Sequence, residues 1–508
     1  MNQTSNPKPR RILISDITHA HPLTKRAYPT DSYYTKLANR LLDDFCSTGI
    51  DLEENAENIL RYASITLACY LEDVVADSGQ WRAFSYLCQQ MFGWPVPVYH
   101  DNEEEYYPDE PSMMAVRFLI WHAATEMDDI WWKPGLPEFD TLAHSAYHLL
   151  MEEFEKAPVN EQLSTDIDKM LDEAYGDFYK MRIALTWLFS SCYITRSEAG
   201  ELLLGNQIKK ASHIMQDNSM CLYYACNYCI FAYKIGPLAL YPKDYLAALA
   251  RSRNKKSLSD ILDAVEVFPT NTFQMKVSED GGTIDLLCTN GKTLKINRDE
   301  VTLKDKEIAR FDGCVASFVS FRNEWKLNGV LTPLEGCIDR WDKLVKEDPD
   351  YMPEEHANAD ADWFLRLTNE RQMLFFGDWD ETKDYLVSKL KFTEEGMQVF
   401  NGNVKTDQGT MLFIDKDDSY NCLQFTFGFN ESIKAPDNPF YDADTAREEA
   451  VEMLWNDDCV GTGAMLYMLD RGLLPDLLND ELIMQDNPAE VKDRDARFLL
   501  RYMRKERY

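Results

Sequence analysis

The chain has 508 residues, of which 45% are hydrophobic and 27% charged, a composition that excludes wholesale disorder. One hydrophobic core stops growing at about 250–300 residues, so this length predicts several domains. The formal net charge of −33 disfavours nucleic acids and anionic membranes as partners, because both repel a polyanion. The partners that this charge attracts should be cationic, namely basic proteins, metal ions or basic small molecules, and among them we expect a protein partner. For the acidic surface itself, the interpretation that we favour is that it keeps the chain soluble.

The cysteines indicate the compartment. All 12 are scattered at irregular spacing, unlike the dense pattern of a secreted disulfide scaffold, so we expect a reducing, cytoplasmic location. No secretory signal is evident. The most apolar segment, 218–242, contains Asn227 and Lys234 and ends at Gly236-Pro237. It predicts a buried helix and not a membrane span.

The N-terminal half shows the apolar spacing of helices. After an irregular lead-in over residues 1–30, Thr30 or Asp31 can cap a first long helix. Ser164 or Thr165 can cap a later one. Further helices are predicted over 59–74, 80–91, 113–132 and 142–150, with helical spacing persisting to about residue 250. This pattern predicts a helical domain over residues 1–255.

The pattern changes to strands from about residue 260. Short alternating segments joined by turn residues cover 272–277, 283–288, 293–297, 313–321 and 325–331. Five short strands with tight turns favour a small SH3-like or OB-like β-barrel module over residues 256–335.

The remaining chain mixes both patterns. Segment 363–376 is strand-like, 380–390 is helical, and 411–414 and 421–429 return to strand. Apolar residues between 446 and 454 then share one helix face. We predict an α+β domain over 336–440 and a helical C-terminal unit over 441–508. The expected fold class is therefore multi-domain α+β.

Two acidic residues inside an apolar helix are the main candidates for chemistry. Glu72 and Asp73 interrupt an otherwise apolar run, and His122 and Glu126 interrupt another, one turn apart. A buried carboxylate must be paired, protonated or bound to a metal. Together the four residues could form a metal site in the core of a helical bundle. The alternative, which we favour, is a structural network with Arg82, Arg117 or a tyrosine, in which His122 is a core histidine.

Two other histidine pairs are candidate metal ligands. His19 and His21 resemble the His-x-His entry of metal-dependent hydrolases, but helices follow where alternating strands would be needed. His144, His148 and Glu152 share one helix face, which the apolar pattern predicts to be exposed to solvent.

A basic cluster precedes the predicted β module. Arg251, Arg253, Lys255 and Lys256 could contact a phosphate or an acidic partner. The interpretation that we favour is that they pair with acidic residues of their own chain.

Several stretches resemble a bacterial family catalogued only as a domain of unknown function. They are residues 29–34, 69–74 together with Trp81, 117–122, 236–245 and 472–476. The resemblance implies a cytoplasmic bacterial protein with a helical N-terminal part and a mixed C-terminal part. It implies no activity and no ligand.

Taken together, these patterns favour a binding or regulatory protein that acts through protein–protein interaction. We assign no catalytic residue and no cofactor, and an enzyme is the less favoured class. The first alternative is a metal-dependent enzyme with its site in the helical bundle core, at Glu72, Asp73, His122 and Glu126. The second is an acidic nucleic-acid mimic or a binder of basic proteins.

Overall fold

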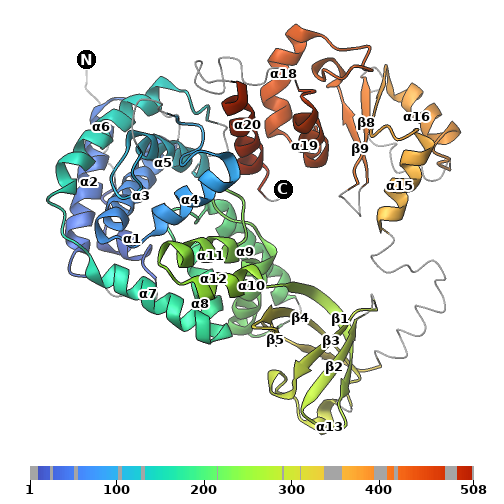
Figure 1. Ribbon diagram of the computed structural model, residues 1–508, viewed down its shortest axis with the longest axis horizontal. Helices are drawn as coiled ribbons and strands as arrows, with labels where there is room; N and C mark the ends of the chain where they lie inside the picture. The colour runs from blue at the N-terminus through green and yellow to red at the C-terminus, as the bar shows by residue number, and fades with distance from the viewer. Residues whose placement is uncertain are drawn as a thin grey trace. The chain divides into compact units, whose positions relative to one another are not determined.

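The computed structural model describes most of the chain (Figure 1). The described residues are 10–22, 27–50, 55–100, 106–127, 132–213, 215–288, 291–308, 310–336, 357–393, 409–416, 422–474 and 489–505. The chain divides into two compact units, Met1–Arg340 and Trp341–Tyr508. The predicted borders at 255, 335 and 440 stay predictions.

The first unit begins with a helical layer, as the apolar spacing predicts. Its helices are α1 Ile14–Thr18, α2 Asp31–Ser47, α3 Ala56–Ala76, α4 Gln80–Phe92, α5 Met113–Glu126, α6 Pro137–Phe154, α7 Glu161–Gly176, α8 Phe178–Ser190, α9 Glu198–Ser212, α10 Asn218–Ala232, α11 Pro242–Ser252 and α12 Lys256–Asp263. Helices α3 and α5 are buried on nearly every side, because their sequences are apolar all round.

Three local expectations differ from the structure. The lead-in contains the short helix α1. Helix α7 begins at Glu161, and Asn160 caps it by accepting from the backbone N–H of Leu163. The helix expected to reach residue 132 ends at Glu126, and residues 128–131 lie outside the described part. An Asn cap is as favourable as a Ser cap, so Asn160 sets the earlier start.

The sequence predicts that segment 218–242 is a buried helix and not a membrane span. Within the described ranges, no helix combines the length and apolar character needed to cross a bilayer. The segment contains helix α10, which buries Cys221, Cys229 and Ile230.

A six-stranded sheet completes the first unit. Its strands are β1 Val267–Val277, β2 Thr283–Cys288, β3 Thr293–Asn297, β4 Gly313–Phe321, β5 Glu324–Leu327 and β6 Thr332–Leu334, in the order β1-β2-β3-β5-β4-β6 with β1 also paired to β4. Strands β1, β2, β3, β5 and β4 thus pair in a ring, but β3 and β5 are joined only by a single parallel bridge between Ile296 and Trp325. The module is therefore a curved sheet around a core that contains Phe273 and Phe318, and not a clear SH3-like or OB-like barrel.

The second unit is mixed. It contains α15 Ala357–Leu367, β7 Met373–Phe376, α16 Trp379–Ser388, β8 Thr410–Ile414, β9 Leu423–Phe427, α18 Ala443–Trp455, α19 Thr462–Arg471 and α20 Ala489–Met503. The sheet order is β7-β8-β9. The strand expected from residue 363 is a helix as far as Leu367, because Ala361 and Leu365, one turn apart, pack with Ile414. The mixed α+β class is confirmed.

Candidate metal centre

Glu72 and Asp73 are neighbours on α3, and their side chains enter two different polar groups. Both are buried. Successive helical residues point about 100° apart. The two acids therefore do not act as one pair, and each must be followed to its own partners.

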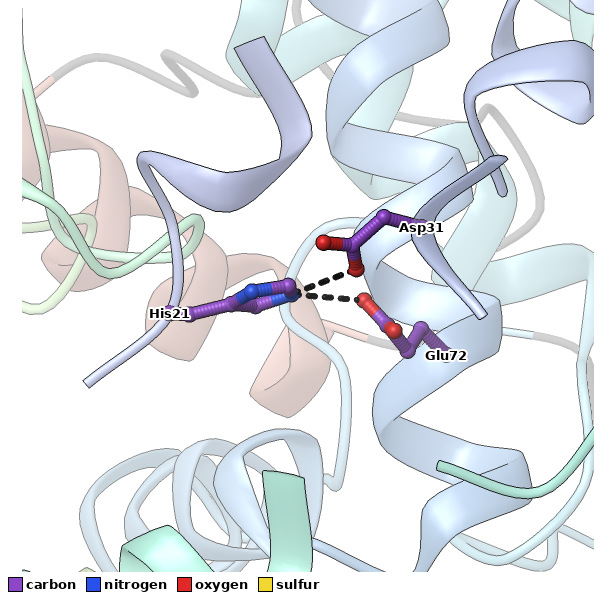
Figure 2. Close-up of side chains that lie close together, drawn as sticks. All are labelled: His21, Asp31 and Glu72. Carbon is purple, nitrogen blue, oxygen red and sulfur yellow. Dashed lines mark hydrogen bonds and ion pairs between the residues drawn. The ribbon is translucent and has the colours of Figure 1, made fainter. Parts of the chain in front are cut away.

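Glu72 meets His21 and Asp31 in a closed group (Figure 2). His21 Nε2 lies 3.1 Å from Glu72 Oε2 and 3.8 Å from Asp31 Oδ1. Each residue offers one ligand atom, and these atoms all lie within 4.8 Å of one another. Among the residues that the structure describes, this is the only group of three or more His, Cys, Asp or Glu side chains with such spacing.

Local structure fixes each member of the group. His21 follows α1, its ring stacks on Tyr28 at 4.4 Å, and the indole N–H of Trp187 donates to the preceding carbonyl, of Ala20, at 2.9 Å. Asp31 is the first residue of α2, and its Oδ2 accepts from the backbone N–H of Tyr28 at 2.6 Å.

The other oxygen of Glu72 is held from a distant helix. Glu72 Oε1 accepts from Asn160 Nδ2 at 2.7 Å, and Asn160 also caps α7. The group is thus assembled from the segment after α1 and from α2, α3 and α7. None of these connections can be read from the sequence spacing.

The negative charge of this buried group must be compensated by a bound proton or a cation. Two carboxylates and one imidazole, each with at most 2% of its side chain exposed, carry a net negative charge even when the imidazole is protonated. Burial raises the pKa of Asp31 to about 6, although the nearby His21 and the N–H of Tyr28 work against this shift. A buried uncompensated charge is costly.

Some polar atoms of the group have no hydrogen-bond partner, and the set of ligand atoms is compatible with a metal ion. Asp31 Oδ1 and His21 Nδ1 are buried without a hydrogen-bond partner. A metal held by His21 Nε2 would leave Nδ1 to carry the imidazole proton. One imidazole nitrogen with two carboxylates suits Zn²⁺, Mn²⁺ or Fe²⁺ better than Mg²⁺ or Ca²⁺, which prefer oxygen ligands. The residues present therefore fit a divalent transition metal.

The Asp73 carboxylate already accepts hydrogen bonds from four donors. Its carboxylate accepts from Ser78 Oγ at 2.5 Å, from the backbone N–H groups of Gln80 and Trp81 at 3.1 and 2.6 Å, and from the Tyr193 hydroxyl at 2.8 Å. Burial raises the pKa of Asp73, and these donors oppose it. Four donors leave little capacity for a metal, so this carboxylate holds the turn between α3 and α4.

His122 and Glu126 form a third group. His122 Nδ1 lies 4.0 Å from Glu126 Oε1, one turn along α5, and both side chains are buried. The four residues predicted from the sequence are thus distributed over three polar groups. That they bind a metal stays a hypothesis, and of the four only Glu72 lies in the group described above.

Two members of the group were not found through that prediction. In the sequence, His21 is a candidate ligand only together with His19, which is the C-cap of α1 and is exposed. Asp31 is predicted there only as a helix cap. The sequence shows an Asp at the start of a helix, but only the tertiary packing shows that its side chain is buried.

The remaining candidates lie at the surface or are paired. His144, His148 and Glu152 are exposed on α6, as the apolar pattern predicts. Three of the four residues of the basic cluster are paired within their own chain, as we favoured, in the ion pairs Arg251–Asp263, Arg253–Asp168 and Lys255–Asp172.

One family matches the chain over most of its length. The family model described as "Protein of unknown function (DUF3843)" matches residues 12–278 and 328–505. The chain belongs to this family. No curated protein and no solved structure matches the chain. His21, Asp31 and Glu72 lie inside the matched segments, whereas residues 279–327, which contain β2, β3, β4 and β5, lie outside them.

Proposed function

We propose that this protein binds one divalent first-row transition metal ion between His21, Asp31 and Glu72. The observation that carries the proposal is the closed spacing of three ligand atoms within 4.8 Å of one another. A net negative, buried group of this kind gains its full compensation from a divalent cation. Asp31 Oδ1 also lacks a hydrogen-bond partner, which supports an additional ligand at this oxygen.

The proposed role of the metal is to stabilise the packing of the segment after α1, which contains His21, against helices α2 and α3. A cation there would join residues that are 10 and 41 positions apart along the chain, on the segment after α1, on α2 and on α3. The side chains are closed to solvent. Three protein ligands would leave one position of a tetrahedral metal unfilled, as in catalytic sites, but the burial of all three side chains would keep a substrate away from it. We therefore place this site with structural or regulatory metals.

Metal content of the purified protein tests the proposal. Inductively coupled plasma mass spectrometry should find about one transition metal ion per chain, lost in Glu72→Gln. The matched control is Glu126→Gln, which alters a buried carboxylate on α5 outside the group. The control should keep its metal. Metal-free wild type that also fails to bind added Zn²⁺, Mn²⁺ or Fe²⁺ would refute the proposal.

The same assay examines the enzyme hypothesis built on Glu72, Asp73, His122 and Glu126. If those residues hold the metal, Glu126→Gln loses it as well. If His21 and Asp31 are the ligands, His21→Ala and Asp31→Asn lose it and Glu126→Gln does not.

A second candidate function is the binding of a basic protein in the cytoplasm. The net charge of −33 supports it, together with the pairing of the basic cluster inside the chain. A pull-down from the native host should recover a basic protein whose binding weakens steeply as salt rises. A stoichiometric complex that does not respond to salt would count against this candidate.

A further inference from the structure

Helix α7 holds the group of His21, Asp31 and Glu72 from outside. Its N-cap, Asn160, is 2% exposed. Asn160 Oδ1 accepts from the backbone N–H of Leu163 at 3.1 Å, and Nδ2 donates to Glu72 Oε1 at 2.7 Å. A backbone N–H can only donate, so this bond fixes which end of the amide is the oxygen and which end faces Glu72. The amide cannot turn away from Glu72 without giving up the cap of α7.

The bond from Asn160 decides which oxygen of Glu72 faces the other two side chains. Oε1 is engaged by Asn160, whereas Oε2 lies 3.1 Å from His21 Nε2. A carboxylate can bind a metal through one oxygen or through both. Hydrogen bonds from residues around a site orient its ligands. With Oε1 held in this way, Glu72 offers a single ligating oxygen.

Asp31 is restricted in the same manner. Its Oδ2 accepts from the backbone N–H of Tyr28 at 2.6 Å, whereas its Oδ1 is buried without a hydrogen-bond partner. Tyr28 is in turn fixed to α7, because its hydroxyl donates to Asp166 Oδ2 at 2.7 Å, and its ring stacks on His21 at 4.4 Å. Both carboxylates therefore have one oxygen engaged by the protein and one oxygen directed at the group.

The number of ligand atoms that results is small. One imidazole nitrogen and two single carboxylate oxygens make three protein ligands. Zn²⁺ is commonly four-coordinate, and three protein ligands with one further ligand are enough for it. Mn²⁺ favours six-coordinate sites made mainly of oxygen. Two-oxygen binding by the carboxylates would supply more of those ligands, and the hydrogen bonds to Oε1 and Oδ2 oppose it.

We propose that Asn160 is a positioning residue, which confines Glu72 to one ligating oxygen and thereby makes the site prefer Zn²⁺ over Mn²⁺. This inference rests on the metal binding proposed above and adds the identity of the ion. Without the Asn160 donor, Oε1 is released to join Oε2 on the metal. The coordination number then rises, which favours Mn²⁺ relative to Zn²⁺.

The affinities of the full chain for Zn²⁺ and Mn²⁺, each measured by competition with a chromophoric chelator, test the proposal. The variant is Asn160→Ser, because serine caps a helix as well as asparagine does, and its shorter side chain does not reach Glu72. We expect the ratio of the Zn²⁺ affinity to the Mn²⁺ affinity to fall by about 10-fold or more in the variant. Bound Co²⁺ should also absorb visible light more weakly there, since its absorption falls as the coordination number rises.

Tyr28→Phe separates the positioning of Glu72 from a general loosening of the site. This variant removes the hydroxyl bond to Asp166 and keeps the ring and the N–H that contact His21 and Asp31. Because Glu72 and its bond to Asn160 are untouched, the ratio of the two affinities should stay at the wild-type value.

Two results would overturn the proposal. One is a wild-type affinity ratio in Asn160→Ser, and the other is an equal fall of the ratio in Tyr28→Phe. Either result, with wild type binding one metal ion per chain, leaves the metal site itself standing. Wild type that binds neither Zn²⁺, Mn²⁺ nor Fe²⁺ refutes the metal site, and the role of Asn160 with it.

Discussion

The protonation of Asp31 links the buried group to pH. In the metal-free protein its pKa is about 6, against 3.8 for an ordinary aspartate. A raised pKa means that the folded state holds the proton more tightly. The stability from this group is therefore complete below about pH 4 and is lost as the pH rises through about 6. A shift of this size corresponds to about 3 kcal/mol.

The expected measurement compares wild type with Asp31→Asn after treatment with EDTA. The free energy of unfolding of wild type minus that of the variant should fall by up to about 3 kcal/mol between pH 4 and pH 7. Taking the difference cancels the carboxylates that the two proteins share. Saturating metal should reverse the trend, because binding requires the carboxylate form. A difference that stays constant with pH would show that Asp31 does not titrate in this window.

At the scale of elements, Arg504 closes the end of a helix in the second unit. The residue is 2% exposed. Its guanidinium donates to the carbonyls of Leu454 at 2.9 Å and Val460 at 2.5 Å, and also to that of Met453. Two of these carbonyls belong to the last turn of α18, where no intrahelical donor is available.

Replacing Arg504 should therefore destabilise the second unit. Arg504→Met leaves buried carbonyls without donors, and we expect a loss of about 2–4 kcal/mol in a urea unfolding curve. Arg497→Met is the matched control on α20, because Arg497 forms a more exposed ion pair with Asp470. Such a pair contributes up to about 1 kcal/mol. Equal losses in both variants would contradict the capping role.

The elements also show what the sequence could and could not predict. The helices of the first unit follow from apolar spacing, and α3 and α5 were identified as containing buried acids. The strand predicted from residue 363 was wrong as far as Leu367, because Ala361 and Leu365, one helical turn apart, pack with Ile414. The metal group was missed because its ligands come from segments up to 51 residues apart. Only packing brings such segments together.

For the whole molecule, the charge of −33 predicts self-repulsion in the compact state. Some of it is relieved locally, as where Arg82 pairs with both Asp77 and Asp109. The rest acts over distances that salt can screen, since the Debye length is about 10 Å at 0.1 M. Added salt should therefore stabilise this protein, although it weakens individual surface ion pairs.

Salt stabilises the fold by screening the net repulsion and destabilises it by weakening surface ion pairs. The direction in which the unfolding temperature changes therefore shows which effect is larger. We expect the unfolding temperature at pH 7 to rise by about 2–4 °C between about 20 mM and about 300 mM NaCl, equivalent to about 1 kcal/mol. Differential scanning fluorimetry measures this, and repeating the titration at about pH 5 supplies the control. Partial protonation of the carboxylates there should shrink the rise. A fall in unfolding temperature at pH 7 would mean that local ion pairs outweigh the net repulsion, and it would remove the electrostatic argument for a basic partner.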